Sequence, residues 1–302
     1  MRLSLTFMSE GSFVAKPTYY GLSGIELDFN SFDLGHGVVL SKTYLHVMAH
    51  PIIAFAPAAP REPNPAPWRT LRAKPSAVSV DLLAQLTVPQ HSGDPRGQYD
   101  WVGWIALLLR FSLDCAVTLT VSADSSFEDV AAGKADANLL EPVREPTEGT
   151  TVHEDDAQWI KNNWYSSLPL SGDPALAFAV RSLYHSHRAT EELGVVSVWG
   201  ALERLFSTNA AELKYRVCTN IAAFLEPPGD GRYLMFKQLT KLYDDRSAAA
   251  HGSAMKSQTA YIDSFHIASR AILRIIEFGQ VPAKETLEQE LLSPSLPEPS
   301  FS

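Results

Sequence analysis

Apolar and polar positions alternate in the first part of the chain, which is the pattern of half-buried strands. Residues 24–29, Gly-Ile-Glu-Leu-Asp-Phe, place an apolar side chain at every second position, and this period of two is typical of a strand with one buried face. Residues 117–121 alternate in the same way and are rich in β-branched side chains, which favours a strand. The short apolar runs at 38–40 and 52–55 also predict strands, whereas 80–88 is apolar without a clear type.

Two further segments of this region have other patterns. Residues 57–75 hold six prolines, and proline removes a backbone donor and fixes its own φ, so we expect a loop there. Residues 101–113 are apolar on most faces, which predicts a buried helix.

Beyond residue 151 the apolar period becomes that of helices. Asp173-Pro174 is a helix start, with a capping side chain followed by proline in the first turn, and Pro227-Pro228-Gly229 is a helix stop. Gly279 and Pro282 end the last periodic segment. Short loops between such helices favour an antiparallel α-bundle. The expected helices are 155–168, 173–184, 195–206, 209–225, 233–243 and 259–278.

The predicted fold class is therefore α+β, with a strand-rich mixed domain followed by an all-α bundle. The composition of 131–151, rich in Ala, Glu, Pro and Gly, indicates a boundary. The predicted domains are 1–150, which we interpret as a sensor or specificity module, and 151–281, the bundle. Residues 282–302 are rich in Pro, Ser and Glu and are expected to be a disordered tail.

Charge and cysteine content exclude several classes of protein. The 302 residues carry a net charge of −9 and no strongly basic region, which argues against a nonspecific nucleic-acid coat protein. Neither cysteine belongs to a Cys-x-x-Cys pair, so a cysteine-based zinc site has no support and two buried thiols in a reducing compartment are expected. The start of the chain makes a poor signal peptide. We predict a soluble, cytoplasmic protein without a membrane partner.

The segment Leu-Tyr-Asp-Asp-Arg-Ser-Ala-Ala-Ala-His-Gly, residues 242–252, combines two chemical groups, Arg246 and His251, in a helical pattern that ends on glycine. Two other stretches accompany it: Val-Trp-Gly-Ala-Leu-Glu-Arg-Leu-Phe at 198–206, and 213–225. Together these stretches resemble the HEPN superfamily, and specifically its Apea-like branch, over roughly residues 155–280. Ser247 follows the arginine, as it does in that branch.

The resemblance implies a helical bundle that pairs as a homodimer, with the Arg and His of both protomers meeting at a cleft. Active members of the family are metal-independent endoribonucleases, common in toxin–antitoxin, phage-defence and RNA-processing systems. Arg246 and His251 match the family's motif and would be the catalytic pair, with RNA as the substrate, no cofactor and no metal. An antitoxin or another component of a defence system would be a partner.

The two side chains suit this chemistry by themselves. Histidine titrates near neutral pH and can act as an acid or a base, and arginine stays charged and grips phosphate oxygens with several donors. Cleavage of RNA can use the 2′-hydroxyl as an internal nucleophile and needs both functions. Positions five apart on a helix differ by about 140° around its axis, so Arg246 and His251 share no face. A second protomer would bring two copies of each group into one cleft.

A structural interpretation of the same residues stays open. Arg246 can form an ion pair with Asp244, Asp245 or Glu203, and His251 can be a helix C-terminal residue favoured by the helix dipole. Under this alternative the bundle is a noncatalytic module that binds RNA or protein. The supporting residues of the candidate site are Glu203, Tyr243, Asp244 and Ser247; we expect Glu203 to be partly buried and paired, and Tyr243 to pack in the core.

Other motifs have little support. His185 and His187 differ by about 200° on a helix and cannot chelate one ion, and the looser group of His36, His46 and His50 lies in a segment expected to be strand or loop. The chain has no Gly-x-Ser-x-Gly, Walker-type loop or Gly-x-Gly-x-x-Gly. No metal, nucleotide or dinucleotide site is therefore predicted.

Overall fold

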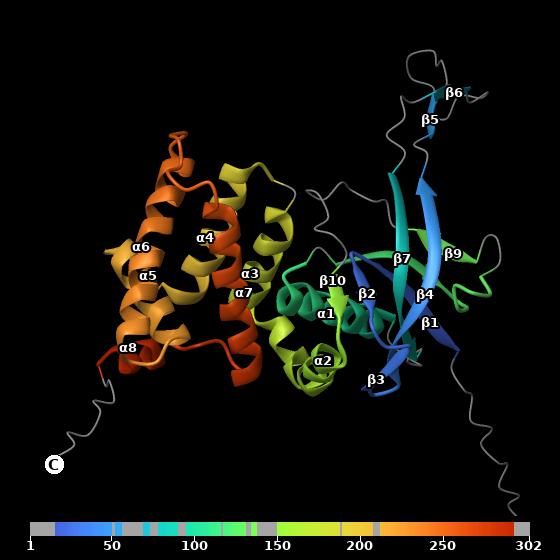
Figure 1. Ribbon diagram of the computed structural model, residues 1–302, viewed down its shortest axis with the longest axis horizontal. Coiled ribbons are helices and arrows are strands. Elements are labelled where there is room, and N and C mark those ends of the chain that lie inside the picture. The colour runs from blue at the N-terminus through green and yellow to red at the C-terminus, as the bar shows by residue number, and fades with distance from the viewer. Residues whose placement is uncertain are drawn as a thin grey trace, which may run out of the picture.

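The computed structural model describes residues 16–49, 52–55, 69–72, 78–89, 95–115, 117–130, 134–137, 150–187, 189–207 and 212–292. Within them, an antiparallel sheet is followed by a helical region, so the α+β prediction is confirmed. The sheet lies at one end of the molecule and the bundle at the other, with α1 (Pro95–Leu113) and α2 (Glu154–Ser167) between them (Figure 1).

Six strands form the main sheet in the order β3-β4-β7-β1-β8-β9, and each neighbouring pair is antiparallel. Two small two-stranded sheets accompany it, β10-β2, which is parallel, and β5-β6. The strands are β1 (Pro17–Ser23), β2 (Ile25–Leu27), β3 (Ser31–Gly35), β4 (Val38–Ala49), β5 (Ile52–Phe55), β6 (Arg69–Arg72), β7 (Val78–Pro89), β8 (Thr118–Ala123), β9 (Ala135–Ala137) and β10 (Thr150–Val152).

The predicted strands agree with β2, β4, β5 and β8, and the apolar segment 80–88 of unclear type lies in β7. The expected loop at 57–75 is wrong for 69–72, which form β6 by pairing with β5 in the register Ile52↔Arg72. This strand lies between prolines, so none of them removes a hydrogen-bond donor from it. Most of the predicted boundary at 131–151 lies outside the described residues.

The region beyond residue 167 is helical in the described part of the chain. The helices of this region are α3 (Pro174–Ser186), α4 (Glu191–Phe206), α5 (Leu213–Leu225), α6 (Asp230–Ala250), α7 (Ala260–Phe278) and α8 (Lys284–Leu292), and a 3-10 turn at Leu168–Gly172 joins α2 to α3. As predicted, Asp173 caps α3, because its Oδ1 accepts from the amides of Ala175 at 2.8 Å and Leu176 at 2.9 Å. Gly279 ends α7 with φ of 71°.

Helix α4 lies at the centre of the bundle, where it packs against α3, α5, α6 and α7. Trp199 of α4 is fully buried, and its indole Nε1 donates to Ser264 Oγ of α7 at 3.1 Å. At Gly194 a Cβ atom would lie 2.8 Å from the Tyr261 ring, so glycine allows α4 and α7 to approach closely here. Among the described residues, no helix is long and apolar enough to cross a membrane.

The tail prediction is wrong for residues 284–292, which form α8. Leu287 of α8 is 2% exposed and belongs to the main core, and its amide donates to Ala283 O at 3.1 Å. Burial of the large apolar side chain of Leu287 against the bundle stabilises α8. The polar composition of residues 282–302 gave no sign of this contact. Residues 293–302 lie outside the described part of the chain.

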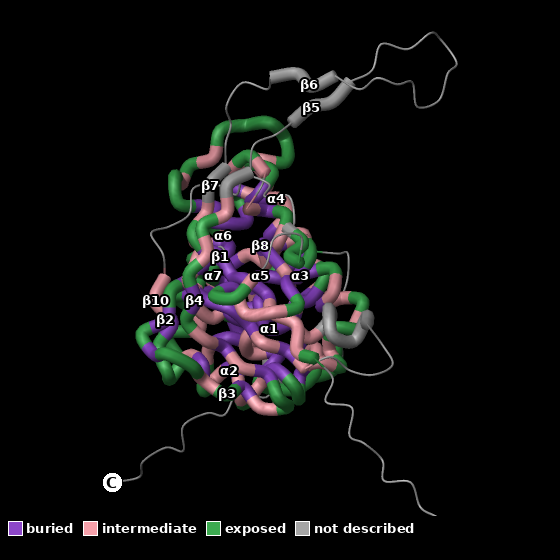
Figure 2. The backbone as a smooth tube through the Cα atoms, turned by 90° about the vertical axis from the view of Figure 1, so that its right-hand side faces the viewer, coloured by how far each residue is buried: buried purple, intermediate pink, exposed green. Residues whose placement is uncertain are grey.

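One hydrophobic core joins the sheet to the bundle. One cluster of buried residues includes members of the sheet, of α1 and α2 and of the bundle. Figure 2, viewed from the side of the sheet, shows buried residues in the middle of the molecule and exposed ones around them. Two tryptophans add polar contacts across this junction: Trp104 Nε1 donates to Ser167 Oγ at 2.9 Å, and Trp164 Nε1 donates to Leu34 O at 2.8 Å. The predicted division at residue 150 falls inside β10, which pairs with β2 before α2 begins, and the packing continues across it.

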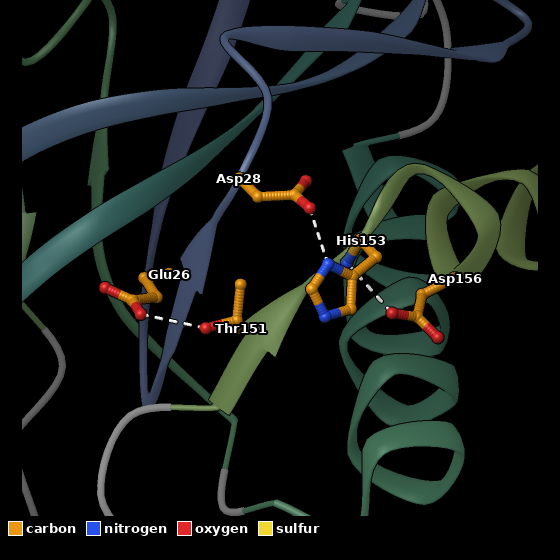
Figure 3. Close-up of polar contacts among 5 residues, drawn as sticks. All are labelled: Glu26, Asp28, Thr151, His153 and Asp156. Carbon is orange, nitrogen blue, oxygen red and sulfur yellow. Dashed lines mark hydrogen bonds and ion pairs between the residues drawn. The ribbon is translucent and has the colours of Figure 1, made fainter.

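A set of polar contacts closes the junction where β10 leads into α2 (Figure 3). His153 Nδ1 lies 2.5 Å from Asp28 Oδ2, and the backbone amide of His153 donates to Asp156 Oδ2 at 2.9 Å. Thr151 Oγ1 donates to Glu26 Oε1 at 2.8 Å. The hydrogen bond and the negative charge of Asp28 raise the pKa of His153. A second histidine pair links two other elements: His266 of α7 pairs with Asp114, which follows α1.

Candidate functional site

The Arg–His segment is the C-terminal part of α6. The sequence predicted a helix over 233–243, but α6 continues without interruption to Ala250. Residues 248–250 are three alanines, the best helix formers, and the helix stops only where Gly252 takes φ of 69°. Arg246 therefore lies within a regular helix, and His251 is the residue that caps its end.

Arg246 is anchored to α4 within the same chain. Its Nη2 lies 3.1 Å from Glu203 Oε1 and 3.2 Å from Glu203 Oε2, and the two side chains are 25% and 18% exposed. Of the three carboxylates that the sequence offered as partners, the structure thus selects Glu203. The Arg246 guanidinium also lies 5.4 Å from the centre of the Tyr243 ring, within the range of a cation–π contact.

Tyr243 completes this cluster from the side of the core, as predicted. Its hydroxyl donates to Glu203 Oε1 at 2.9 Å, and its ring meets Trp199 edge to face with centroids 5.0 Å apart. Burial, followed by the hydrogen bond and charge of Glu203, raises the pKa of Tyr243 to about 12. Tyr243 is therefore a neutral hydrogen-bond donor at physiological pH, and its role in the cluster is to hold the Glu203 carboxylate in place.

His251 lies at a glycine-capped helix end. The amide of Ser253 donates to Ala248 O at 2.9 Å and that of Gly252 donates to Ala249 O at 3.2 Å, which is the Schellman arrangement with glycine in the left-handed position. The side chain of His251 is exposed, and in the described part of the chain it has no ion pair. Its position at the end of the helix leaves the imidazole open to a ligand.

The neighbouring acidic residues have separate partners. Asp244 is exposed and accepts from Lys214 Nζ at 2.6 Å. Asp245 is buried, and its Oδ1 accepts from the backbone amide of Lys256 at 2.6 Å. Asp245 thus holds the loop that follows His251, a role that no pattern in the sequence signalled because it depends on a contact with that loop. Ser247 is half-buried on the same helix.

The structure brings together Glu203, Tyr243 and Arg246, and it leaves Asp244 and His251 outside this cluster. The Arg246 side chain is 25% exposed, and its Nε is buried without a hydrogen-bond partner among the described residues. The cluster can present a fixed positive charge to an anion, and the imidazole of His251 is a group of the kind that acts as an acid or a base. Arg246 faces α4 through its contact with Glu203, and His251 lies at the cap of the helix.

The described residues contain neither a candidate metal site nor a reactive thiol. These residues include no group of three or more His, Cys, Asp and Glu side chains placed to hold a metal ion; His50 lies outside them. Cys115 and Cys218 are buried as predicted, and burial raises the pKa of their thiols to about 11 and about 12. Such thiols remain protonated and are poor nucleophiles.

Comparisons with protein-family models, with curated proteins and with solved structures found no match to this chain.

Proposed function

We propose that the protein is a metal-independent endoribonuclease of HEPN type, acting through Arg246 and His251. The observation that supports this function most is the fixed arginine: Glu203 and Tyr243 hold its guanidinium in place, and the side chain keeps 25% of its surface exposed, through which it would contact a phosphate. His251 stands exposed at the capped end of the same helix, where RNA can reach it.

The proposed reaction is transfer of the phosphate to the neighbouring 2′-oxygen. A histidine takes the proton of the 2′-hydroxyl, the bond from O2′ to phosphorus forms, and the bond from phosphorus to O5′ breaks. A protonated histidine supplies the proton that O5′ gains, so the products are a cyclic phosphate and a 5′-hydroxyl. Arg246 binds the charged oxygens of the phosphorane, a role that suits its fork of donors.

This reaction is proposed to require a homodimer through the bundle. Within one chain, Arg246 faces Glu203 of α4 while His251 lies about 140° away around the helix axis. A second copy of α6 would place the histidine of one protomer near the arginine of the other and would supply both an acid and a base.

The competing proposal is a noncatalytic module that binds RNA or protein. It is favoured by the ion pair itself, since Glu203 already neutralises Arg246 inside one chain. Under this proposal the pair serves to join α4 to α6, and His251 serves to end the helix.

The cellular context rests on the family resemblance of the sequence. It includes a cytoplasmic location, a role in defence or as a toxin, and a partner that restrains the protein. The strand-rich region 1–150 would then sense a signal or select the RNA.

The decisive experiment compares the wild type with Arg246→Ala and His251→Ala. We expect growth arrest on expression and RNA cleavage by the purified wild type, with cleavage reduced about 10²- to 10⁴-fold in His251→Ala if it acts as acid or base. Cleavage should persist in EDTA, and sedimentation should show a dimer. Intact RNA with all three proteins across the pH range would leave the noncatalytic module as the function.

A further inference from the structure

A pocket opens between the start of α6 and the adjoining face of α5, far along the helix from His251. Its volume is about 360 Å³, and its walls include Tyr215 and Thr219 of α5 and Arg232, Tyr233 and Phe236 of α6. This volume is at the small end of ligand pockets, so it fits a single flat ring system.

Two tyrosines at the pocket are unusually exposed. Tyr215 is 60% and Tyr233 is 58% exposed, although a large aromatic side chain normally gains by burial. Tyr215 meets Phe236 edge to face, with centroids 5.7 Å apart and an interplanar angle of 76°. The Tyr215 ring is thus braced from one side while much of its surface remains open to a ligand.

The rim of the pocket is positively charged and fixed. Arg232 Nε donates to Glu226 O at 2.9 Å, which ties its guanidinium to the end of α5. Lys237 Nζ lies 5.3 Å from the centre of the Tyr233 ring. Neither Lys237 nor Lys241 forms an ion pair with a carboxylate in the part of the chain that the structure describes.

The charge of this region differs in sign from that of the chain. Residues 212–256 hold seven basic and five acidic residues, a net charge of +2, against −9 for all 302 residues. An anionic ligand is therefore favoured here. The lysines also argue against a protein partner, because protein interfaces are depleted of Lys.

The geometry of α6 places this pocket and His251 on one side of the helix. Tyr233 and His251 are 18 positions apart, which is five full turns and about 27 Å along the axis. Lys237 lies within about 40° of the same line. A strand bound along this side would pass from the pocket, over Lys237 and then over the Lys214–Asp244 ion pair, to the exposed imidazole.

We propose that this pocket binds an unstacked base of single-stranded RNA whose backbone follows α6 toward His251. The inference rests on the proposed function for the identity of the ligand. Single-stranded RNA is recognised through bases that stack on aromatic side chains while cations follow the backbone, and Tyr215, Tyr233 and Lys237 supply both elements.

The test is the affinity for a fluorescent single-stranded RNA with 2′-O-methyl groups, which cannot use its 2′-oxygen as a nucleophile. Fluorescence anisotropy should show that Tyr215→Ala and Tyr233→Ala raise Kd about 5- to 150-fold, the range for loss of one stacked base. Tyr233→Phe keeps the ring and should bind like the wild type, whereas Tyr233→Leu keeps apolar volume and should bind like Tyr233→Ala. Tyr44→Ala, at a 63% exposed tyrosine of β4, is the matched control and should have no effect.

Three outcomes would overturn the inference: no binding of this RNA by the wild type, unchanged affinity in both tyrosine-to-alanine variants, or dimer dissociation in those variants that accounts for their weaker binding. The last would identify the face as an interface between copies of the chain. Cleavage of ordinary RNA separates this inference from the proposed function. If the wild type cleaves RNA and the tyrosine substitutions do not change RNA binding, only the proposed base pocket is contradicted. If binding depends on the tyrosines but no RNA is cleaved, only the proposed nuclease activity is contradicted.

Discussion

Glu203 of α4 and Arg246 of α6 form an ion pair in which one guanidinium nitrogen, Nη2, contacts both carboxylate oxygens, at 3.1 and 3.2 Å. Tyr243 donates to the same carboxylate. Because both charged side chains are mostly buried, the pair limits the directions in which Arg246 can point. Arginine orientation is therefore a property of the α4–α6 packing, and each member of the cluster can be tested separately.

Glu203→Gln should weaken the cluster while preserving its shape. The glutamine oxygen still accepts from Tyr243 or Arg246, but the charge that balances the arginine is lost. We expect the free energy of unfolding to fall by about 1–3 kcal/mol, measured by urea denaturation, and any RNA cleavage to fall less than in Arg246→Ala. Glu226→Gln is the control, because its partner Arg270 is half exposed and its loss should cost about 1 kcal/mol or less.

Asp245→Ala should loosen the loop after α6. The buried carboxylate accepts from the Lys256 amide at 2.6 Å, and its removal leaves that amide without its partner, at a cost of about 1–3 kcal/mol. Hydrogen exchange in residues 251–259 should become faster. Asp244→Ala, at the adjacent exposed position, should leave the exchange of this loop unchanged, and equal exchange in both variants would show that Asp245 does not hold it.

Gly252→Ala tests the helix cap beside His251. A Cβ atom at Gly252 would meet nothing within 4 Å, so a side chain here would not be crowded. The obstacle to substitution is the backbone, because φ of 69° is unfavourable for residues other than glycine. Alanine in the left-handed region should cost about 1–2 kcal/mol, measured by thermal or urea unfolding. Gly252→Asn should cost less, since asparagine visits this region more readily. An equal decrease in the free energy of unfolding in the two variants would argue against the backbone conformation of Gly252 as the cause.

The His153–Asp28 pair should make stability depend on pH. The pKa of His153 is raised in the folded protein, so the pair's contribution is fully present below the ordinary histidine pKa of about 6.5 and is lost as pH rises through the raised value. The Tm difference between wild type and Asp28→Asn should be largest near pH 6 and should shrink toward pH 9. Asp136→Asn, at an exposed position of β9, should show no such trend, and a constant difference for Asp28→Asn would exclude the pair as its source.

Local sequence determined much of the helical half. The apolar period, the Asp173 cap and the glycine stops at 252 and 279 depend on residues close together in the chain, so the pattern predicted the helices and most of their ends. The strands were harder, because β1, for example, gains its structure from β7 and β8, which lie far away in the sequence. Leu287 likewise stabilises α8 only through contact with the bundle.

For the candidate site, the sequence by itself determined that Arg246 and His251 lie on one helix about 140° apart, because helix geometry follows from spacing alone. It also offered three carboxylates as partners for the arginine without deciding among them. Only the tertiary structure selected Glu203, 43 positions away, sent Asp245 to the following loop and left His251 exposed. The physical reason is that helix packing sets which side chains meet across two helices, and packing depends on the whole core.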